Sequence, residues 1–166
     1  MTNIAKLSRK AAWMASCRRA RLEDSLQTNI QDMTITYQDT HEFTKEELEA
    51  LFLSVEWSSG HYPDKLVVAM RNYKTVYSAW HGDKLVALAC AMDDGIMTAY
   101  IHYLLVRPEY QGMGIGRKLV EMMKVQYKDY LRISLVAYDK GLKFYESCGF
   151  KKGVDESPMF ITSLWT

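Results

Sequence analysis

The chain has 166 residues, which fits one domain and is long enough to bury a sizeable core. Its 21 Lys and Arg nearly balance its 20 Asp and Glu, so it carries no general basic field for nucleic acid. Three widely spaced cysteines without a C-x-x-C pair argue against a disulfide framework and a zinc site. No apolar run approaches the ~18 residues of a membrane span. Composition therefore predicts a reduced, cytoplasmic, globular protein that has no metal and makes no contact with nucleic acid or membrane.

The first 22 residues differ from the rest of the chain, because they hold six basic side chains and no acidic one. Such a start is typical of a poorly ordered extension, of an organellar transit peptide, or of an arm that contacts nucleic acid or a membrane surface. We expect a basic, poorly ordered extension over residues 1–30 and the working domain over residues 31–166. Organellar targeting by the extension stays open.

The first part of this domain predicts a strand and two helices. Residues 34–38 alternate apolar and polar side chains, as a half-buried strand does. Thr44 and Glu47 have the spacing of a capping box, residues 57–60 form a loop, and Pro63 fits the first turn of a second helix. The first helix has an apolar face at helical spacing, made by Leu48, Leu51, Phe52 and Val55.

The second part predicts strands over residues 75–80, 85–92 and 98–106, separated by the tight-turn pairs Gly82-Asp83 and Asp94-Gly95. A glycine-rich turn and a long helix follow. The remaining elements are a strand over 132–137, a short helix over 140–148 that Gly149 ends, and a last strand over Phe160–Leu164. The order β-α-α-β-β-β-α-β-α-β predicts an α/β or α+β fold, in which helices cover one sheet.

The strongest chemical signal lies where the strand over 98–106 runs through Gln111-Gly-Met-Gly-Ile-Gly116 into a helix. Glycines let the main chain approach a phosphate closely, and the N–H groups of the first helical turn face such a ligand. Arg117 and Lys118 add positive charge at the same end. The spacing fits neither the G-x-G-x-x-G dinucleotide pattern nor the Walker pattern. A tight turn without a ligand is the alternative.

Two motifs in this sequence resemble those of the GNAT acetyltransferase superfamily. Gln111, Gly114 and Gly116 match its acyl-CoA signature, Arg/Gln-x-x-G-x-G/A, and residues 144–150 match a downstream F-Y-E-x-x-G-F motif. The resemblance covers roughly residues 33–166. A looser likeness extends to small bacterial members and to plant-type aralkylamine (serotonin) N-acetyltransferases. The resemblance implies a mixed, mostly antiparallel central sheet flanked by helices in a single domain, and acetyl-CoA as the acyl donor.

The resemblance also implies positions for acetyl-CoA. The strand over residues 100–106 would line its pantetheine arm, through main-chain groups near Leu105 and Val106. Tyr145 would face the sulfur atom. Asp139 stands where the family often has an Asn, which puts a contact there in doubt. The pyrophosphate would lie against the loop and its basic end: Gln111, Gly112, Met113, Gly114, Ile115, Gly116, Arg117 and Lys118.

Two side chains fit the proton transfers of acetyl transfer to an amine. Tyr145 can give a proton to the departing thiolate, and His102, near the cofactor loop, can take one from the amine, since an unperturbed imidazole titrates near pH 6.5. A satisfied histidine on the sheet face, or proton loss through a chain of waters, is the alternative to His102. Cys148 has no accompanying His-Asp pair and fits the core.

Aromatic side chains are the clue to the acceptor. Trp57, Tyr62 and Tyr103 flank the expected pocket and can stack on an aromatic amine or hold an ammonium group. Core packing is the alternative for each of them. Glu56 can pair with an ammonium or be a solvated surface charge.

These observations predict an acetyl-CoA-dependent N-acetyltransferase that acts on a small primary amine, such as an aralkylamine or a polyamine-like compound. A protein or peptide N-acetyltransferase is the nearest alternative, and a silent CoA-binding sensor is the alternative from another class. The apolar segment Phe160–Trp165 offers an edge for a homodimer.

Overall fold

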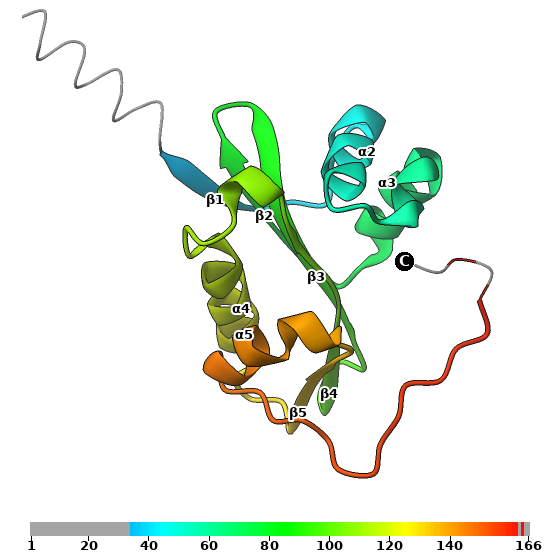
Figure 1. Cartoon of the computed structure of the whole chain (residues 1–166), viewed down its shortest axis with the longest axis vertical. Coiled ribbons are helices and arrows are strands. Elements are labelled where there is room, and N and C mark those ends of the chain that lie inside the picture. Colours follow the sequence, from blue (N-terminus) through cyan, green and yellow to red (C-terminus); the bar gives the residue numbers. More distant parts are fainter. Residues whose placement is uncertain (1–33, 163, 165–166) are drawn as a thin grey trace, which may run out of the picture. The chain divides into compact units, whose positions relative to one another are not determined.

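A five-stranded mixed sheet forms the centre of the protein in the computed structural model, which describes residues 34–162 and 164 (Figure 1). The strand order is β1-β2-β3-β4-β5. β2 pairs with β3 and β3 with β4 in antiparallel fashion, whereas β4 and β5 are parallel. The mostly antiparallel sheet predicted from the sequence is thereby confirmed. The strands are β1 Ile35–Asp39, β2 Thr75–His81, β3 Lys84–Asp93, β4 Thr98–Val106 and β5 Arg132–Leu135.

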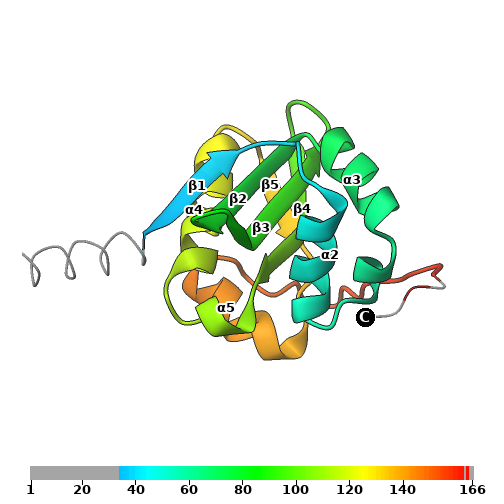
Figure 2. The ribbon, with the colours of Figure 1, turned by 90° about the horizontal axis from the view of Figure 1, so that it is seen from above.

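Helices cover both faces of this sheet (Figures 1 and 2). α2 and α3 lie on one face, and α4 lies on the other with α5 beside it. Because both faces are covered, β2 and β3 are buried except at their end residues. The helices are α2 Lys45–Ser54, α3 Pro63–Asn72, α4 Ile115–Gln126 and α5 Leu142–Ser147, with 3₁₀ turns at Ser58–His61, Pro108–Tyr110 and Asp139–Gly141.

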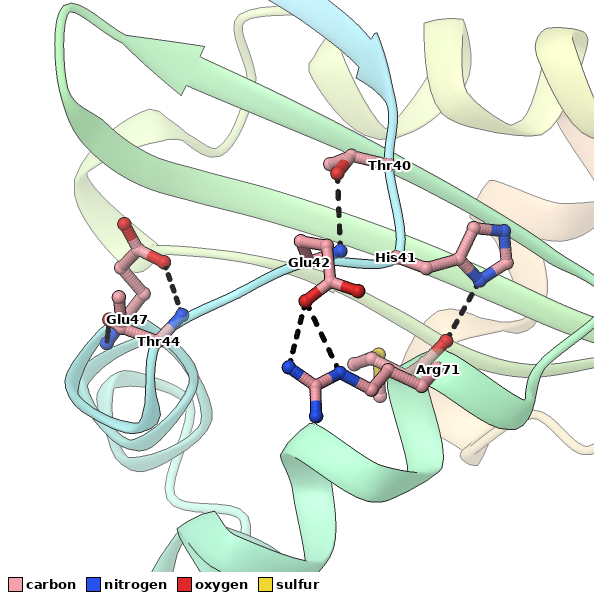
Figure 3. Close-up of polar contacts among 7 residues, drawn as sticks. Thr40, His41, Glu42, Thr44, Glu47 and Arg71 are labelled. Carbon is pink, nitrogen blue, oxygen red and sulfur yellow. Dashed lines mark hydrogen bonds and ion pairs between the residues drawn. The ribbon is translucent and has the colours of Figure 1, made fainter.

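The start of α2 is fixed by the predicted capping box (Figure 3). The Glu47 N–H donates to Thr44 Oγ1 at 3.2 Å, and the Thr44 N–H donates to Glu47 Oε2 at 2.8 Å. Just before it, the Glu42 carboxylate accepts two hydrogen bonds from Arg71, at the end of α3. The segment between β1 and α2 is therefore tied to both helices on this face.

The core on this face is made by the apolar sides of α2 and α3, packed on β2 to β4. Leu48, Leu51 and Phe52 of α2 are fully buried, as the helical spacing predicts. On the other face α4 buries Ile115, Leu119, Val120 and Met123. The short loop predicted over residues 57–60 is largely the 3₁₀ turn Ser58–His61.

The predicted last strand over Phe160–Leu164 is wrong, since residues 160–162 and 164 adopt no strand. A strand forms only where a partner edge offers hydrogen bonds, and the local pattern of apolar residues cannot supply one. The side chains of Met159 and Ile161 are exposed instead. The homodimer that was to use this segment as its edge stays a prediction, without a strand to support it.

The two last strands of the sheet diverge after a short stretch of pairing. β5 pairs with β4 only from Thr98 to Ile101, and it ends at Leu135, two residues earlier than predicted. The register of β4 against β3 shifts between Ile101 and Tyr103, so His102 is the extra residue of a β-bulge. Beyond the bulge, β4 is paired with β3 in the described ladder, while β5 has ended and leaves the other edge of β4 without a strand.

Candidate active site

A cavity of about 750 Å³ lies at the point where β4 and β5 diverge. The second half of β4, the glycine loop, the segment after β5 and the end of α2 surround it. Most of the residues predicted for the site line this one space. They are Trp57, His102, Leu105, Val106, Gln111, Gly112, Gly114, Ile115, Gly116, Arg117 and Tyr145.

The glycine loop owes its shape to two left-handed residues. Gly112 has φ +77° and Gly114 has φ +82°, and a Cβ added to either would meet no atom within 4 Å. The Gln111 side chain closes the loop by donating from Nε2 to the Val106 carbonyl oxygen at 3.0 Å. Gly114 has no capping side chain, so the N–H groups of residues 115–117 point out of the helix start as anion donors.

Gly116 lies against packed side chains, in contrast to the two left-handed glycines. A Cβ at this position would stand 3.5 Å from both Phe144 Cζ and Val106 Cγ2, which is ordinary van der Waals contact. The guanidinium of Arg117 is also held by protein groups, since it donates to the Ser147 carbonyl at 3.0 Å and to Ser147 Oγ at 2.8 Å. α4 is thereby fixed to the end of α5. Met113 and Lys118, predicted for the same loop site, do not line the cavity.

Tyr145 reaches the cavity from α5, between the rings of Phe144 and Phe150. The helix ends in a Schellman motif, in which the Phe150 N–H donates to the Tyr145 carbonyl and Gly149 has φ +96°. Burial, and to a lesser extent the nearby Cys148, raises the pKa of Tyr145 to about 12. The phenol therefore keeps its proton at neutral pH and is available as a donor.

His102 reaches the cavity because of the bulge in β4. Its Nδ1 lies 2.8 Å from the hydroxyl of Tyr73, the residue that ends α3. Desolvation by burial lowers the pKa of His102 below its ordinary value. The imidazole is therefore neutral at pH 7 and can accept a proton.

The aromatic residues predicted for the acceptor divide into three cases. Trp57 lines the cavity. Tyr103 packs edge-on against Phe52, at a centroid distance of 5.0 Å, and lies behind Trp57 rather than in the lining. Tyr62 is 48% exposed and lies under the Lys65 ammonium group, outside the cavity. The acceptor roles of Tyr62 and Tyr103 stay predictions.

Sequence reasoning named one more lining residue and missed others. Glu56, considered from the sequence as an ammonium partner or a surface charge, lines the cavity next to Trp57. Asp139, whose contact with acetyl-CoA the sequence put in doubt, is exposed and does not line the cavity. A rule that ligands gather beyond the carboxyl ends of strands would have indicated the segment after β5. The remaining lining residues are Ser54, Val55, Ile101, Leu104, Pro108, Tyr110, Leu135, Val136, Ala137, Tyr138, Lys140, Gly141 and Phe144.

Two further findings concern the described residues. No group of three His, Cys, Asp or Glu side chains within residues 34–162 is arranged to hold a metal ion. No helix in the described part of the chain is long and apolar enough to cross a membrane. The cytoplasmic location stays a prediction, and the basic segment over residues 1–30 lies outside the described residues.

Two curated relatives illustrate the similarity in sequence. GCN5-related N-acetyltransferase 2, chloroplastic, from Arabidopsis thaliana is 40% identical over 70 residues, which are 41% of this chain and 27% of that protein. The uncharacterized N-acetyltransferase ycf52 from Pyropia yezoensis is 30% identical over 115 residues, which are 66% of each protein. The chain thus spans less than two thirds of the length of either relative. Both names agree with the predicted enzyme class.

A solved structure and a family model also match this chain to acetyltransferases. The solved structure of a GNAT-family acetyltransferase from Streptococcus pneumoniae superposes with a TM-score of 0.67 at 26% identity, over 78% of this chain and 98% of that one. The family model described as the acetyltransferase (GNAT) domain matches residues 72–152, which include the glycine loop and the motif around Tyr145. The resemblance first drawn from two motifs is confirmed, and the chain belongs to the GNAT-domain acetyltransferase family.

Proposed function

We propose that this chain is an acetyl-CoA-dependent N-acetyltransferase that transfers the acetyl group directly to a primary amine of a small molecule. The observation that carries the proposal is the convergence of three features on one cavity. These are the edge of β4 that diverges from β5, the glycine loop at the start of α4, and the Tyr145 phenol.

The glycine loop fits the pyrophosphate of acetyl-CoA. The space beside Gly112 and Gly114 is open where any other residue would carry a Cβ, so the main chain can approach phosphate oxygens closely. The N–H groups of residues 115–117 can donate to those oxygens, and the helix dipole favours their negative charge. Arg117 and Lys140 in the lining add two positive charges.

The edge of β4 fits the amide groups of the pantetheine arm. Past Ile101 the described ladder pairs β4 with β3 alone, so the main-chain groups near Leu105 and Val106 on the other edge can bond an extended ligand. A ligand held in this way adds to the sheet as one more strand would. Leu104 and Leu105 also contribute apolar surface to the cavity.

His102 and Tyr145 divide the proton transfers between them. Acetyl-CoA supplies an acetyl group activated as a thioester. His102 takes the proton that the amine loses as its nitrogen forms the bond to the acetyl carbon. Tyr145 gives its phenolic proton to the sulfur as the carbon–sulfur bond breaks, and the proton on His102 then returns through solvent to restore the phenol. The lowered pKa of His102 and the raised pKa of Tyr145 put each group in the required protonation state at pH 7.

The acceptor end of the cavity favours a small cationic or aromatic amine. Glu56 and Trp57 stand together at the end of α2, and both line the cavity. A carboxylate attracts an ammonium group, and an indole face binds either a cation or an aromatic ring. A diamine can keep one ammonium near Glu56 while its other nitrogen, deprotonated, attacks the thioester.

Replacing Tyr145 with Phe tests the proposal. The change removes one hydroxyl and almost no volume, so binding of acetyl-CoA, measured by calorimetry, should be unchanged. The turnover number should fall by ~10²–10⁴, the usual contribution of a positioned acid or base. Thiol release and the mass of the acetylated product should be followed with monoamines, diamines and short peptides. Tyr130→Phe is the control, since the Tyr130 hydroxyl bonds Asp93 and lies outside the cavity.

The outcomes separate the possible functions. Equal turnover of Tyr145→Phe and wild type, with chemistry rate-limiting, contradicts the role of Tyr145. Acetylation of peptides but of no small amine indicates a protein acceptor. Binding of acetyl-CoA without acetylation of any acceptor by the wild type indicates a CoA-binding sensor.

A further inference from the structure

We propose that Tyr73 is a positioning residue, which holds His102 in the tautomer that carries its proton on Nδ1 and leaves the Nε2 lone pair free. The inference rests on the proposed function, because a free Nε2 is what His102 needs to accept the proton of the amine. Tyr73 itself does not line the cavity, so it acts through His102 alone.

The geometry fixes the imidazole on three sides. The Tyr73 hydroxyl lies 2.8 Å from Nδ1, and the two rings meet edge-on at 84° with centroids 5.8 Å apart. The centroid of the Tyr103 ring lies 4.2 Å from that of the imidazole, and the centroid of the Tyr100 ring lies 5.9 Å from it. Because Nδ1 is bonded to Tyr73 and His102 lines the cavity, Nε2 is the nitrogen left for a substrate.

The Tyr73 phenol is neutral when it bonds His102. Burial raises the pKa of Tyr73, and the buried Cys90 of β3 lies beside it. Burial also raises the pKa of the Cys90 thiol, to about 12. Both groups therefore keep their protons at pH 7, and the Tyr73 oxygen has lone pairs with which to accept a hydrogen bond.

The role of His102 as a base decides the tautomer. An imidazole accepts a proton on Nε2 only when its own proton is on Nδ1. The Tyr73 oxygen, 2.8 Å from Nδ1, is then the acceptor of that N–H.

The pH dependence has a defined sign. The titratable groups that contact His102 in the described part of the chain are the phenols of Tyr73, Tyr100 and Tyr103, all neutral at pH 7. Desolvation lowers the pKa of His102, so the rate should fall as pH drops through a midpoint below about 6.5. Loss of the Tyr73 acceptor removes a bond that favours the imidazolium, and the midpoint should move lower still. The other titratable groups in the cavity lining are Glu56, Tyr110, Arg117, Tyr138, Lys140 and Tyr145.

The test compares wild type with Tyr73→Phe by ¹⁵N NMR of the histidine side chains, with the His102 signals assigned from their loss in His102→Ala. Wild type should show the Nδ1–H tautomer of His102, and Tyr73→Phe should shift the population toward Nε2–H. The turnover number of Tyr73→Phe should fall by about 10-fold, a part of what a positioned base contributes. Tyr100→Phe is the matched control, because its ring lies near the same imidazole, and it should keep the wild-type tautomer.

Two outcomes decide against the inference. A wild-type His102 in the Nε2–H form, or an unchanged tautomer in Tyr73→Phe, overturns the inference. The expected tautomers in a protein that acetylates no amine support the positioning role and overturn the proposed function, so the two failures are distinguishable.

Discussion

Glu56 occupies a backbone position that normally belongs to glycine. It has φ +61°, its N–H donates to the Leu53 carbonyl, and the Trp57 N–H donates to the Phe52 carbonyl, which is the Schellman pattern at the end of α2. The rings of Phe52 and Trp57 make the accompanying apolar contact. A side chain in this left-handed conformation costs about 1–2 kcal/mol relative to glycine. Glu56 also lines the cavity, so the proposed binding of an acceptor ammonium group would account for a residue that the helix end alone does not favour.

We expect Glu56→Gly to change stability and activity in opposite directions. Glycine relieves the left-handed strain, so the free energy of unfolding should rise by up to about 1 kcal/mol. Loss of the carboxylate should raise KM for cationic amines by about 10-fold, while KM for acetyl-CoA stays the same.

Glu56→Gln is the matched variant, because it removes the charge and keeps the strain. It should raise KM for cationic amines as Glu56→Gly does, with wild-type stability in a denaturant titration. An unchanged KM in both variants would show that Glu56 is a surface charge.

At the scale of elements, the glycine loop and the β3–β4 turn offer a controlled comparison. Gly114 has φ +82° and Gly95 has φ +87°, and a Cβ at either meets no atom within 4 Å. Only Gly114 lines the cavity. Gly114→Val and Gly95→Val should therefore lose similar stability, about 1–2 kcal/mol, from the same backbone strain.

The same pair should differ in affinity for acetyl-CoA. Valine at position 114 puts two methyl groups where the pyrophosphate is proposed to lie, so binding measured by calorimetry should be lost, whereas Gly95→Val should bind as wild type does. Circular dichroism and a thermal melt check that both variants are folded. Retained binding by Gly114→Val would mean that the loop assignment is wrong.

Elements set by local chemistry could be predicted from the sequence. The capping box at Thr44, Pro63 at the start of α3 and Gly149 at the end of α5 each act within a few residues, and the structure has all three. The bulge at His102 depends on how β4 is registered against β3, which the β4 sequence alone does not determine. The predicted strand over Phe160–Leu164 was wrong for a similar reason, because a strand forms only where the edge of another strand is available for pairing.

The residues of the candidate site likewise divide into those placed by local sequence and those placed by the fold. The loop from Gln111 to Gly116 is specified by its own glycines, and all of its residues except Met113 line the cavity. His102 and Tyr103 are neighbours on one strand, and the fold alone decides that the first lines the cavity while the second packs on Phe52. The link from His102 to Tyr73 joins residues 29 positions apart, and no sequence pattern indicated it.

At the scale of the whole molecule, charge divides the chain into two parts. Residues 1–22 hold six of the 21 basic side chains and none of the 20 acidic ones, so the remainder is acidic overall. An acidic domain gives an anionic ligand no general attraction. The proposed affinity for acetyl-CoA would then come from local donors, which are the N–H groups of the loop with Arg117 and Lys140.

Removal of residues 1–30 should therefore leave acetyl transfer unchanged. A chain that begins at Gln31 keeps β1, which starts at Ile35, together with the whole cavity lining. Its turnover number, its affinity for acetyl-CoA and its thermal midpoint should match those of the full chain. A chain that begins at Glu42 is the contrasting variant, because it lacks β1 and loses the bonds from the Thr40 N–H to the Val76 carbonyl and from Ser78 Oγ to the Gln38 carbonyl. This shorter chain should melt at a lower temperature. A large fall in turnover for the chain that begins at Gln31, with its circular dichroism unchanged, would assign the basic segment a part in the site.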